Sequence, residues 1–248
     1  MGFKCFRMSV NWTRIFSDGD EQRRYTALHH QLVASAKAVK MAHEIAPDNQ
    51  VGCMLLSRVS YPYTCRAEDV LKAQQVMQTA NYYCGDVHVR GEYPAFAGRL
   101  WREKGITIPF AEGDREALKE GRVDFVSFSY YSSSTATDDP TVPVANGNMM
   151  RGPANPYLEQ SQWGWTIDPK GLRYLLNEFY GRWKRTGVSM TNIASHICGS
   201  ISKRWRKLSQ DSEDCARNKL GKGKQTYNKF NPKRRNCLHV GKGAYLQR

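Results

Sequence analysis

Strand-like and helix-like stretches alternate along the first 183 residues, and this order restricts the fold more than any other feature of the chain. Strand-like patterns, rich in apolar residues or alternating between apolar and polar ones, occupy residues 3–10, 51–56 and 123–131. Helix-like spacing of apolar residues occupies 24–45, 67–82 and 95–103 and resumes at Pro169. Because strands separated by helices usually pair in parallel, the sequence predicts an α/β fold with a parallel sheet.

Two of these helices have the clearest local signals. Between Arg24 and Ile45 apolar residues recur at helical spacing, and Pro47 closes the pattern. Asp168 stands before Pro169, the order that is typical of a helix N-cap followed by the first helical residue. The Ser-, Thr-, Asp- and Pro-rich stretch that runs to about residue 160 predicts a long loop. In such folds the loops that follow strands carry functional residues.

The positive charge of the chain is confined to its last quarter. The net charge is +14, from 37 Lys and Arg against 23 Asp and Glu. Residues 182–248 hold 17 of the basic residues and only three of the acidic ones, so residues 1–181 are neutral. We therefore expect a folded domain at 1–183 and an unrelated, disordered basic tail at 184–248.

The cysteines and histidines follow no metal-binding pattern. Seven cysteines are spread along the chain, which has neither a Cys-x-x-Cys nor a His-Glu-x-x-His motif. The sequence has no secretory signal pattern at its start and no apolar run of about 18 residues, as a membrane span requires. We therefore expect a cytoplasmic protein with reduced cysteines, and no metal, cofactor or membrane contact.

Five segments resemble the motifs of one known family. They are Cys5–Phe16 (CFRMSVNWTRIF), His29–Lys40, Arg90–Pro94, Asp124–Tyr131 and Trp163–Leu172. In this order they resemble glycoside hydrolase family one, the retaining β-glycosidases. The segments DVHVRG (86–91) and WGWTIDPKG (163–171) are similar in sequence to the 6-phospho-β-glucosidases of that family. The resemblance covers nearly all of residues 1–181 and ends near Trp183.

The resemblance implies a fragment of an eight-stranded (β/α)8 TIM barrel. The matching strands are the second, fifth and sixth, and the first strand is expected to be missing. The third and fourth are expected to be lost in a deletion near residues 21–24, and a change of reading frame is expected near residue 183. Because three strands cannot close a barrel and leave open edges, we expect low stability or aggregation unless the chain pairs with something.

The implied reaction needs two carboxyl groups about 5 Å apart. The family carries its acid/base in a T-x-N-E motif and its nucleophile in an (I/V)-x-E-N-G motif, and neither occurs in this sequence. The Asn177-Glu178 pair lies in the helix after Asp168 and is expected on the solvated surface. By family the substrates would be β-glucosides or phospho-β-glucosides, but we expect no catalytic residue and no hydrolysis.

Three residues match the substrate pocket of the family. Arg7 resembles the arginine that hydrogen-bonds the nucleophile, and Tyr130 and Tyr131 resemble the tyrosine pair that supports it. Each also has a structural alternative. For Arg7 this is an ion pair on an inward-facing strand, and for the tyrosines it is core packing with one hydrogen-bonded hydroxyl.

The basic tail leaves a second function open. Its clusters Lys203–Lys207 and Lys233–Arg235, interleaved with Trp205, Tyr227 and Phe230, are typical of proteins that bind phosphate backbones. No nucleic-acid-binding motif accompanies these clusters, and translation in another frame explains the same composition. Non-specific nucleic-acid or partner binding through 184–248 is therefore the alternative function.

Overall fold

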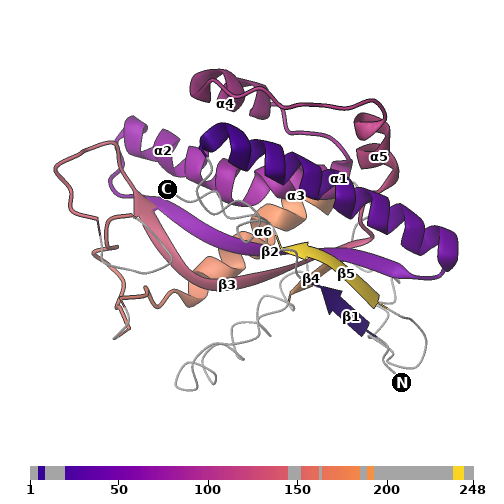
Figure 1. Cartoon of the computed structure of the whole chain (residues 1–248). Helices are drawn as coiled ribbons and strands as arrows, with labels where there is room; N and C mark the ends of the chain where they lie inside the picture. Colours follow the sequence, from indigo (N-terminus) through magenta and orange to yellow (C-terminus); the bar gives the residue numbers. More distant parts are fainter. Residues whose placement is uncertain are drawn as a thin grey trace.

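The five described strands form one parallel sheet. A computed structural model of the chain describes residues 20–144, 152–161 and 164–184 in full, and the backbone of 5–8, 189–192 and 237–242 (Figure 1). The strands are β1 (Cys5–Met8), β2 (Gln50–Pro62), β3 (Phe125–Ala136), β4 (Ser189–Asn192) and β5 (Cys237–Lys242). Their order is β1-β5-β2-β3-β4, and every neighbouring pair is parallel. The predicted α/β fold with a parallel sheet is confirmed.

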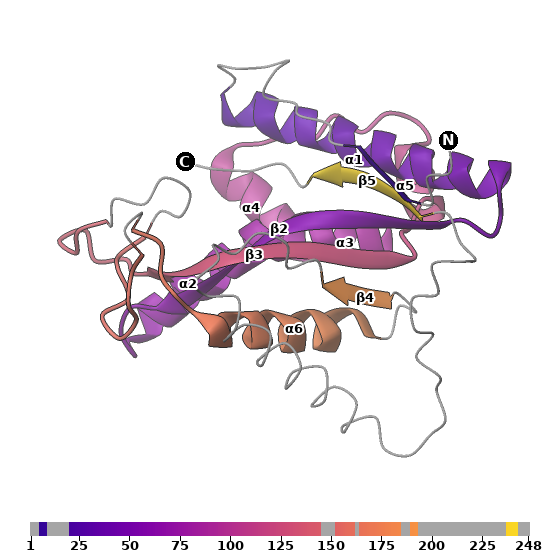
Figure 2. The ribbon, with the colours of Figure 1, turned by 90° about the horizontal axis from the view of Figure 1, so that it is seen from below.

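The helices flank this sheet along its length. They are α1 (Glu21–Ile45), α2 (Ala67–Met77), the π-helix η2 (Gln78–Tyr82), α3 (Tyr83–Arg90), α4 (Ala97–Lys104), α5 (Asp114–Glu120) and α6 (Pro169–Trp183). Figure 2 shows α1 along the β5 side of the sheet and α6 along the β4 side, with α3 behind the two long strands. The predicted helices at 24–45 and from Pro169 are confirmed, whereas α3 and α5 were not predicted.

The two central strands are longer than their sequence patterns predict. β2 continues to Pro62 and β3 continues to Ala136, and the two strands pair up to those last residues. The extension of β3 is rich in serine, and Ser132, Ser133 and Ser134 are nevertheless buried. The hydroxyl of Ser132 donates to the carbonyl of Thr166, 3.1 Å away. Pairing with β2 and such side-chain bonds therefore hold as strand a stretch whose composition predicts a loop.

Two strands come from the segment that was expected to be disordered. β5 lies between β1 and β2, and β4 pairs with β3 at the other side of the sheet. The structure therefore differs from the expectation over Ser189–Asn192 and Cys237–Lys242. The physical reason is that β2 and β3 each present a row of backbone groups that an added strand can pair with. The clusters Lys203–Lys207 and Lys233–Arg235 lie outside the described residues.

Apolar side chains from the helices and the sheet form one core. The periodic positions of α1 contribute Leu28, Leu32 and Val39, and β2 contributes Val51, Cys53 and Leu55. From β3 and α6 the core includes Val126, Phe128, Leu175, Phe179 and Trp183. These positions match the apolar stripes seen in the sequence, so burial of those stripes accounts for the placement of α1 and α6 on the sheet.

A buried ion pair joins the end of α6 to α3. Asp86 is fully buried and accepts hydrogen bonds from Arg182 Nε (2.8 Å), Arg182 Nη2 (2.6 Å) and Trp183 Nε1 (2.8 Å). The Trp183 ring is also fully buried and stacks on Phe179 at 4.8 Å between centroids. The residue near which the resemblance was expected to end is therefore part of the core.

Candidate functional site

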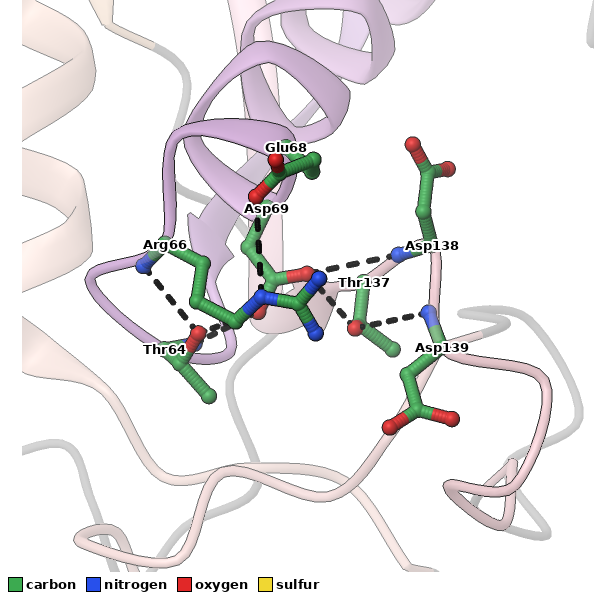
Figure 3. A network of polar contacts seen from close by, with 7 residues as sticks. All are labelled: Thr64, Arg66, Glu68, Asp69, Thr137, Asp138 and Asp139. Atoms are coloured by element: carbon green, nitrogen blue, oxygen red, sulfur yellow. Dashed lines mark hydrogen bonds and ion pairs between the residues drawn. The ribbon is translucent and has the colours of Figure 1, made fainter.

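The carboxyl ends of β2 and β3 lie side by side and carry a network of polar residues (Figure 3). Thr64 and Arg66 follow β2, Asp69 lies in the first turn of α2, and Thr137 and Asp138 follow β3. In barrels of parallel strands and helices, active sites form at the carboxyl ends of the strands. We therefore take this edge of the sheet as the candidate site.

Asp69 is the centre of the network. Its Oδ2 accepts hydrogen bonds from the amide of Thr64 (3.0 Å) and from the Thr64 hydroxyl (2.6 Å). Its Oδ1 accepts bonds from the Thr137 hydroxyl (2.6 Å) and from the amide of Asp138 (3.3 Å). The bonds from Thr137 and Thr64 lower the pKa of Asp69 to about 2. Asp69 is therefore ionised at neutral pH and links the two loops.

The other acids of the network also have partners. Asp138 forms an ion pair with Lys72, 2.9 Å away, and Glu68 forms one with Arg66 at 3.5 Å. The hydroxyl and the amide of Thr141 donate to Asp139, and these two bonds hold the pKa of Asp139 below its usual value. A general acid needs a pKa near the working pH. Asp69 and Asp139 are therefore stabilised in the state that cannot donate a proton.

A cavity of about 750 Å³ lies beside the network. Its walls include Arg58 on β2, Lys72 on α2, and Thr137 and Asp138 after β3. The Arg58 side chain is half-buried, Nη2 donates to the Ser134 hydroxyl at 3.0 Å, and partial burial lowers the pKa of the guanidinium. The volume is in the range of small-molecule sites, and the lining offers both donors and acceptors. This arrangement suits a polar small molecule.

The sequence-predicted site residues do not meet in the part of the chain that the structure describes in full. Arg7 is in β1, but its side chain lies outside the described residues. Tyr130 is buried, and its hydroxyl donates to the carbonyl of Asp168 at 3.0 Å. Tyr131 is half-buried, and its ring contacts Trp165 edge-on at 5.9 Å between centroids. The two tyrosines therefore have different contacts, and the pairing of β2 with β3 shifts register just after Tyr130.

Glu178 lies in α6, outside the sheet, as the sequence predicts. It is half-buried rather than fully solvated, because its Oε2 accepts a hydrogen bond from the Tyr82 hydroxyl at 2.7 Å. Burial raises the pKa of Tyr82, and the bond to Glu178 raises it further. The tyrosine is therefore the donor of this pair.

Sequence reasoning missed the residues that join the two loops. Thr64, Asp69 and Thr137 belong to no motif that was recognised. Thr64 and Thr137 closely follow the ends of β2 and β3, and Asp69 lies in the first turn of the next helix, α2. Polar residues just after two neighbouring parallel strands are the signal that could have found them, because those strand ends meet at one edge.

Neither a metal site nor a membrane span is present in the described part of the chain. Among those residues no group of three or more His, Cys, Asp or Glu side chains is placed to hold a metal ion. The helices of the same part are too short or too polar to cross a membrane.

Several curated proteins are similar to this chain in sequence. Aryl-phospho-β-D-glucosidase BglH of Bacillus subtilis is 45% identical over 174 residues, which is 69% of this chain and 37% of that protein. The 6-phospho-β-glucosidase AscB of Escherichia coli is 48% identical over 174 residues, 69% of this chain and 36% of that protein. The chain therefore spans just over a third of the length of these relatives.

Solved structures show the same fold over a larger share of the chain. A β-glucosidase from Exiguobacterium marinum matches 89% of this chain and 49% of its own, with a TM-score of 0.61 and 18% identity. A family 1 glycoside hydrolase from Thermotoga maritima matches 86% of this chain and 46% of its own, with a TM-score of 0.57 and 21% identity. The described sheet and helices are thus part of the fold of these enzymes.

The sequence model of Glycosyl hydrolase family 1 matches residues 20–208. The match begins after the Cys5–Phe16 segment and runs beyond residue 183, where the sequence motifs placed the end of the resemblance. It includes β2, β3, α6 and the candidate site between the strand ends. Since it covers more than half of the chain, this protein belongs to glycosyl hydrolase family 1.

Proposed function

We propose that this chain carries part of the barrel of a retaining 6-phospho-β-glucosidase but does not hydrolyse glycosides by itself. The relatives that support the substrate class are named for phospho-β-glucosides and are 45% and 48% identical to this chain. The substrates of the whole protein would then be β-glucosides that carry a phosphate.

The proposed inactivity rests on the charge states of the carboxylates at the strand ends. Retaining hydrolysis needs one carboxylic acid that can give up a proton and one carboxylate that can attack. At this edge Asp69 is held ionised by four hydrogen bonds, and Asp138 is paired with Lys72. The family motifs T-x-N-E and (I/V)-x-E-N-G are absent from the sequence. The roles that the resemblance gives to Arg7, Tyr130 and Tyr131 stay proposals.

Turnover of p-nitrophenyl 6-phospho-β-D-glucoside by the purified full chain tests this proposal. We expect release of nitrophenol no faster than from heat-denatured protein, with a full-length 6-phospho-β-glucosidase as the positive control. Turnover that co-purifies with the chain and is lost on denaturation would show that catalytic carboxylates are present.

If turnover is found, the variants Asp69→Asn and Asp138→Asn identify its origin. Loss of turnover in either variant would make the polar network itself catalytic, against our assignment. Glucosidase activity that both variants retain would place the acid and the nucleophile elsewhere in the chain and would equally contradict the proposed inactivity.

A further inference from the structure

A second pocket lies on the outer, helical side of the sheet. It is bounded by α2, η2, α6 and the end of β2, and its volume is about 460 Å³. We call this the outer pocket and define it by Ser60, Tyr61, Gln78, Tyr82, Tyr174 and Glu178. It shares no lining residue with the cavity at the strand ends.

Tyrosine rings line much of the outer pocket. Tyr61 and Tyr174 have ring centroids 6.1 Å apart, and 40% of Tyr174 remains exposed to solvent. The hydroxyl of Tyr61 donates to Asp168 at 2.9 Å, and that of Tyr82 donates to Glu178 at 2.7 Å. Hydrogen bonds thus fix the Tyr61 and Tyr82 rings in place, which lowers the entropy that a ligand stacking on them would cost.

One buried polar group in the pocket lacks a partner. The Ser60 hydroxyl is buried and has no hydrogen-bond partner among the residues that the structure describes. An unpaired buried hydroxyl costs free energy, so the wall of the pocket at Ser60 is a weakly stabilised part of the fold. The adjacent η2 is a π-helix, a rare element that is frequent at functional sites.

The charges around the pocket are balanced. Arg182 also lines it, but its guanidinium is paired with the buried Asp86 and lies over the Tyr82 ring at 4.4 Å from the centroid. Glu178 is the acid that faces the pocket, and its carboxylate would repel an anion such as a sugar phosphate. The carboxylate and the Gln78 amide offer acceptors and donors to a hydroxylated ligand.

We propose that the outer pocket binds a neutral sugar, with a pyranose ring against Tyr174 and its hydroxyls bonded to Glu178 and Gln78. Aromatic rings beside balanced donors and acceptors match the surface of a pyranose, which has apolar C–H faces and a polar rim. This proposal does not depend on the proposed function, because it concerns binding outside the strand-end site and requires no turnover.

Titration of the full chain with cellobiose, followed by ligand-observed NMR and calorimetry, tests the proposal. We expect saturable binding of cellobiose and at least about tenfold weaker binding of two charged probes. Glucose 6-phosphate brings a charge of the same sign as the Glu178 carboxylate. Tetramethylammonium has no hydroxyl that could form hydrogen bonds with Glu178 and Gln78. Equal or tighter binding of either ion, or no saturable binding of cellobiose, would overturn the proposal.

Variants place the binding in the outer pocket. Glu178→Gln and Tyr174→Ala should each weaken cellobiose binding about tenfold or more. Asn177→Ala, at an exposed neighbouring position of α6, and Lys72→Ala, in the strand-end cavity, should leave it unchanged. Binding that Lys72→Ala abolishes and Glu178→Gln preserves would assign the sugar to the other cavity.

Discussion

Asp86 and His88 lie two residues apart in α3, and both are buried. Asp86 is stabilised by Arg182 and Trp183. His88 is 7% exposed, and burial alone lowers the pKa of its imidazole to about 4. The two residues thus differ in how burial is compensated. Asp86 is paired with a cation, whereas His88 is neutral at pH 7.

His88 should make the fold sensitive to acid. Its pKa is about 4 in the folded chain and about 6.5 when unfolded, so the unfolded state binds the proton first as the pH falls. The free energy of unfolding is therefore unaffected by His88 above pH 6.5, and protonation of His88 in the unfolded chain lowers it by about 3 kcal/mol between pH 6.5 and pH 4. Urea unfolding at several pH values measures this slope, and His88→Gln should flatten it.

The slope is the informative quantity, because a change in packing at position 88 shifts stability at every pH alike. His30→Gln is the matched control, since His30 is exposed and its replacement should leave the slope as it is. A His88→Gln chain that loses stability with acid as steeply as the parent between pH 6.5 and pH 4 would rule out this role.

At the scale of elements, α6 begins where a capping residue and a glycine meet β3. Asp168 caps the helix by accepting from the amide of Gly171 at 2.9 Å, and the Tyr130 hydroxyl donates to the carbonyl of Asp168. A Cβ at position 171 would contact that hydroxyl. Gly171 therefore lets the first turn of α6 approach β3.

Two glycines of α6 should respond oppositely to alanine. Gly171→Ala should lower the free energy of unfolding by about 1–3 kcal/mol, because the new methyl group overlaps the Tyr130 hydroxyl. At Gly181 no described neighbour lies within 4 Å of the place that a methyl group would take, so Gly181→Ala should stabilise the helix by up to about 1 kcal/mol. Urea unfolding measures both changes.

The Tyr130→Phe background separates overlap from other effects at position 171. With the hydroxyl gone, Gly171→Ala should cost clearly less than it does in the parent chain. An equal cost in the two backgrounds would mean that the hydroxyl is not what requires glycine. The free energy of unfolding of the Tyr130→Phe chain also measures how much the bond from the Tyr130 hydroxyl to the Asp168 carbonyl stabilises the N-terminus of α6.

Local signals predicted α1 and α6 because their apolar stripes and the Asp168 cap are complete within one segment. They did not predict α3, whose Gly85, Val87 and Val89 are unfavourable in helices. In the structure a Cβ at Gly85 would meet the Trp183 ring. The helix forms there because tertiary packing against α6 overrides local propensity, and that packing partner is about a hundred residues away in the chain.

At the scale of the whole molecule, the sheet has two outer strands, β1 and β4, in the described part of the chain. An outer strand presents unpaired backbone groups that a second chain can bind. We therefore keep the prediction of low stability or self-association for the isolated chain. It is checked by light scattering after size-exclusion chromatography over a range of concentrations, combined with thermal unfolding.

We expect the mass to rise with concentration and the thermal transition to be broad. A full-length family 1 enzyme, whose barrel closes and has no outer strand, is the control and should remain at one mass. A monomer that unfolds in one sharp, cooperative transition would show that the described core and sheet are sufficient for stability.

The alternation of strands and helices, the family resemblance and the absence of the two carboxylate motifs can be read from the amino-acid order alone, because each depends on short contiguous segments. The folded chain was needed to show that β5 lies between β1 and β2, that Asp69 joins the ends of two strands, and that tyrosines from β2, η2 and α6 surround one pocket. These features depend on contacts between residues far apart in the chain, and no local pattern encodes such contacts.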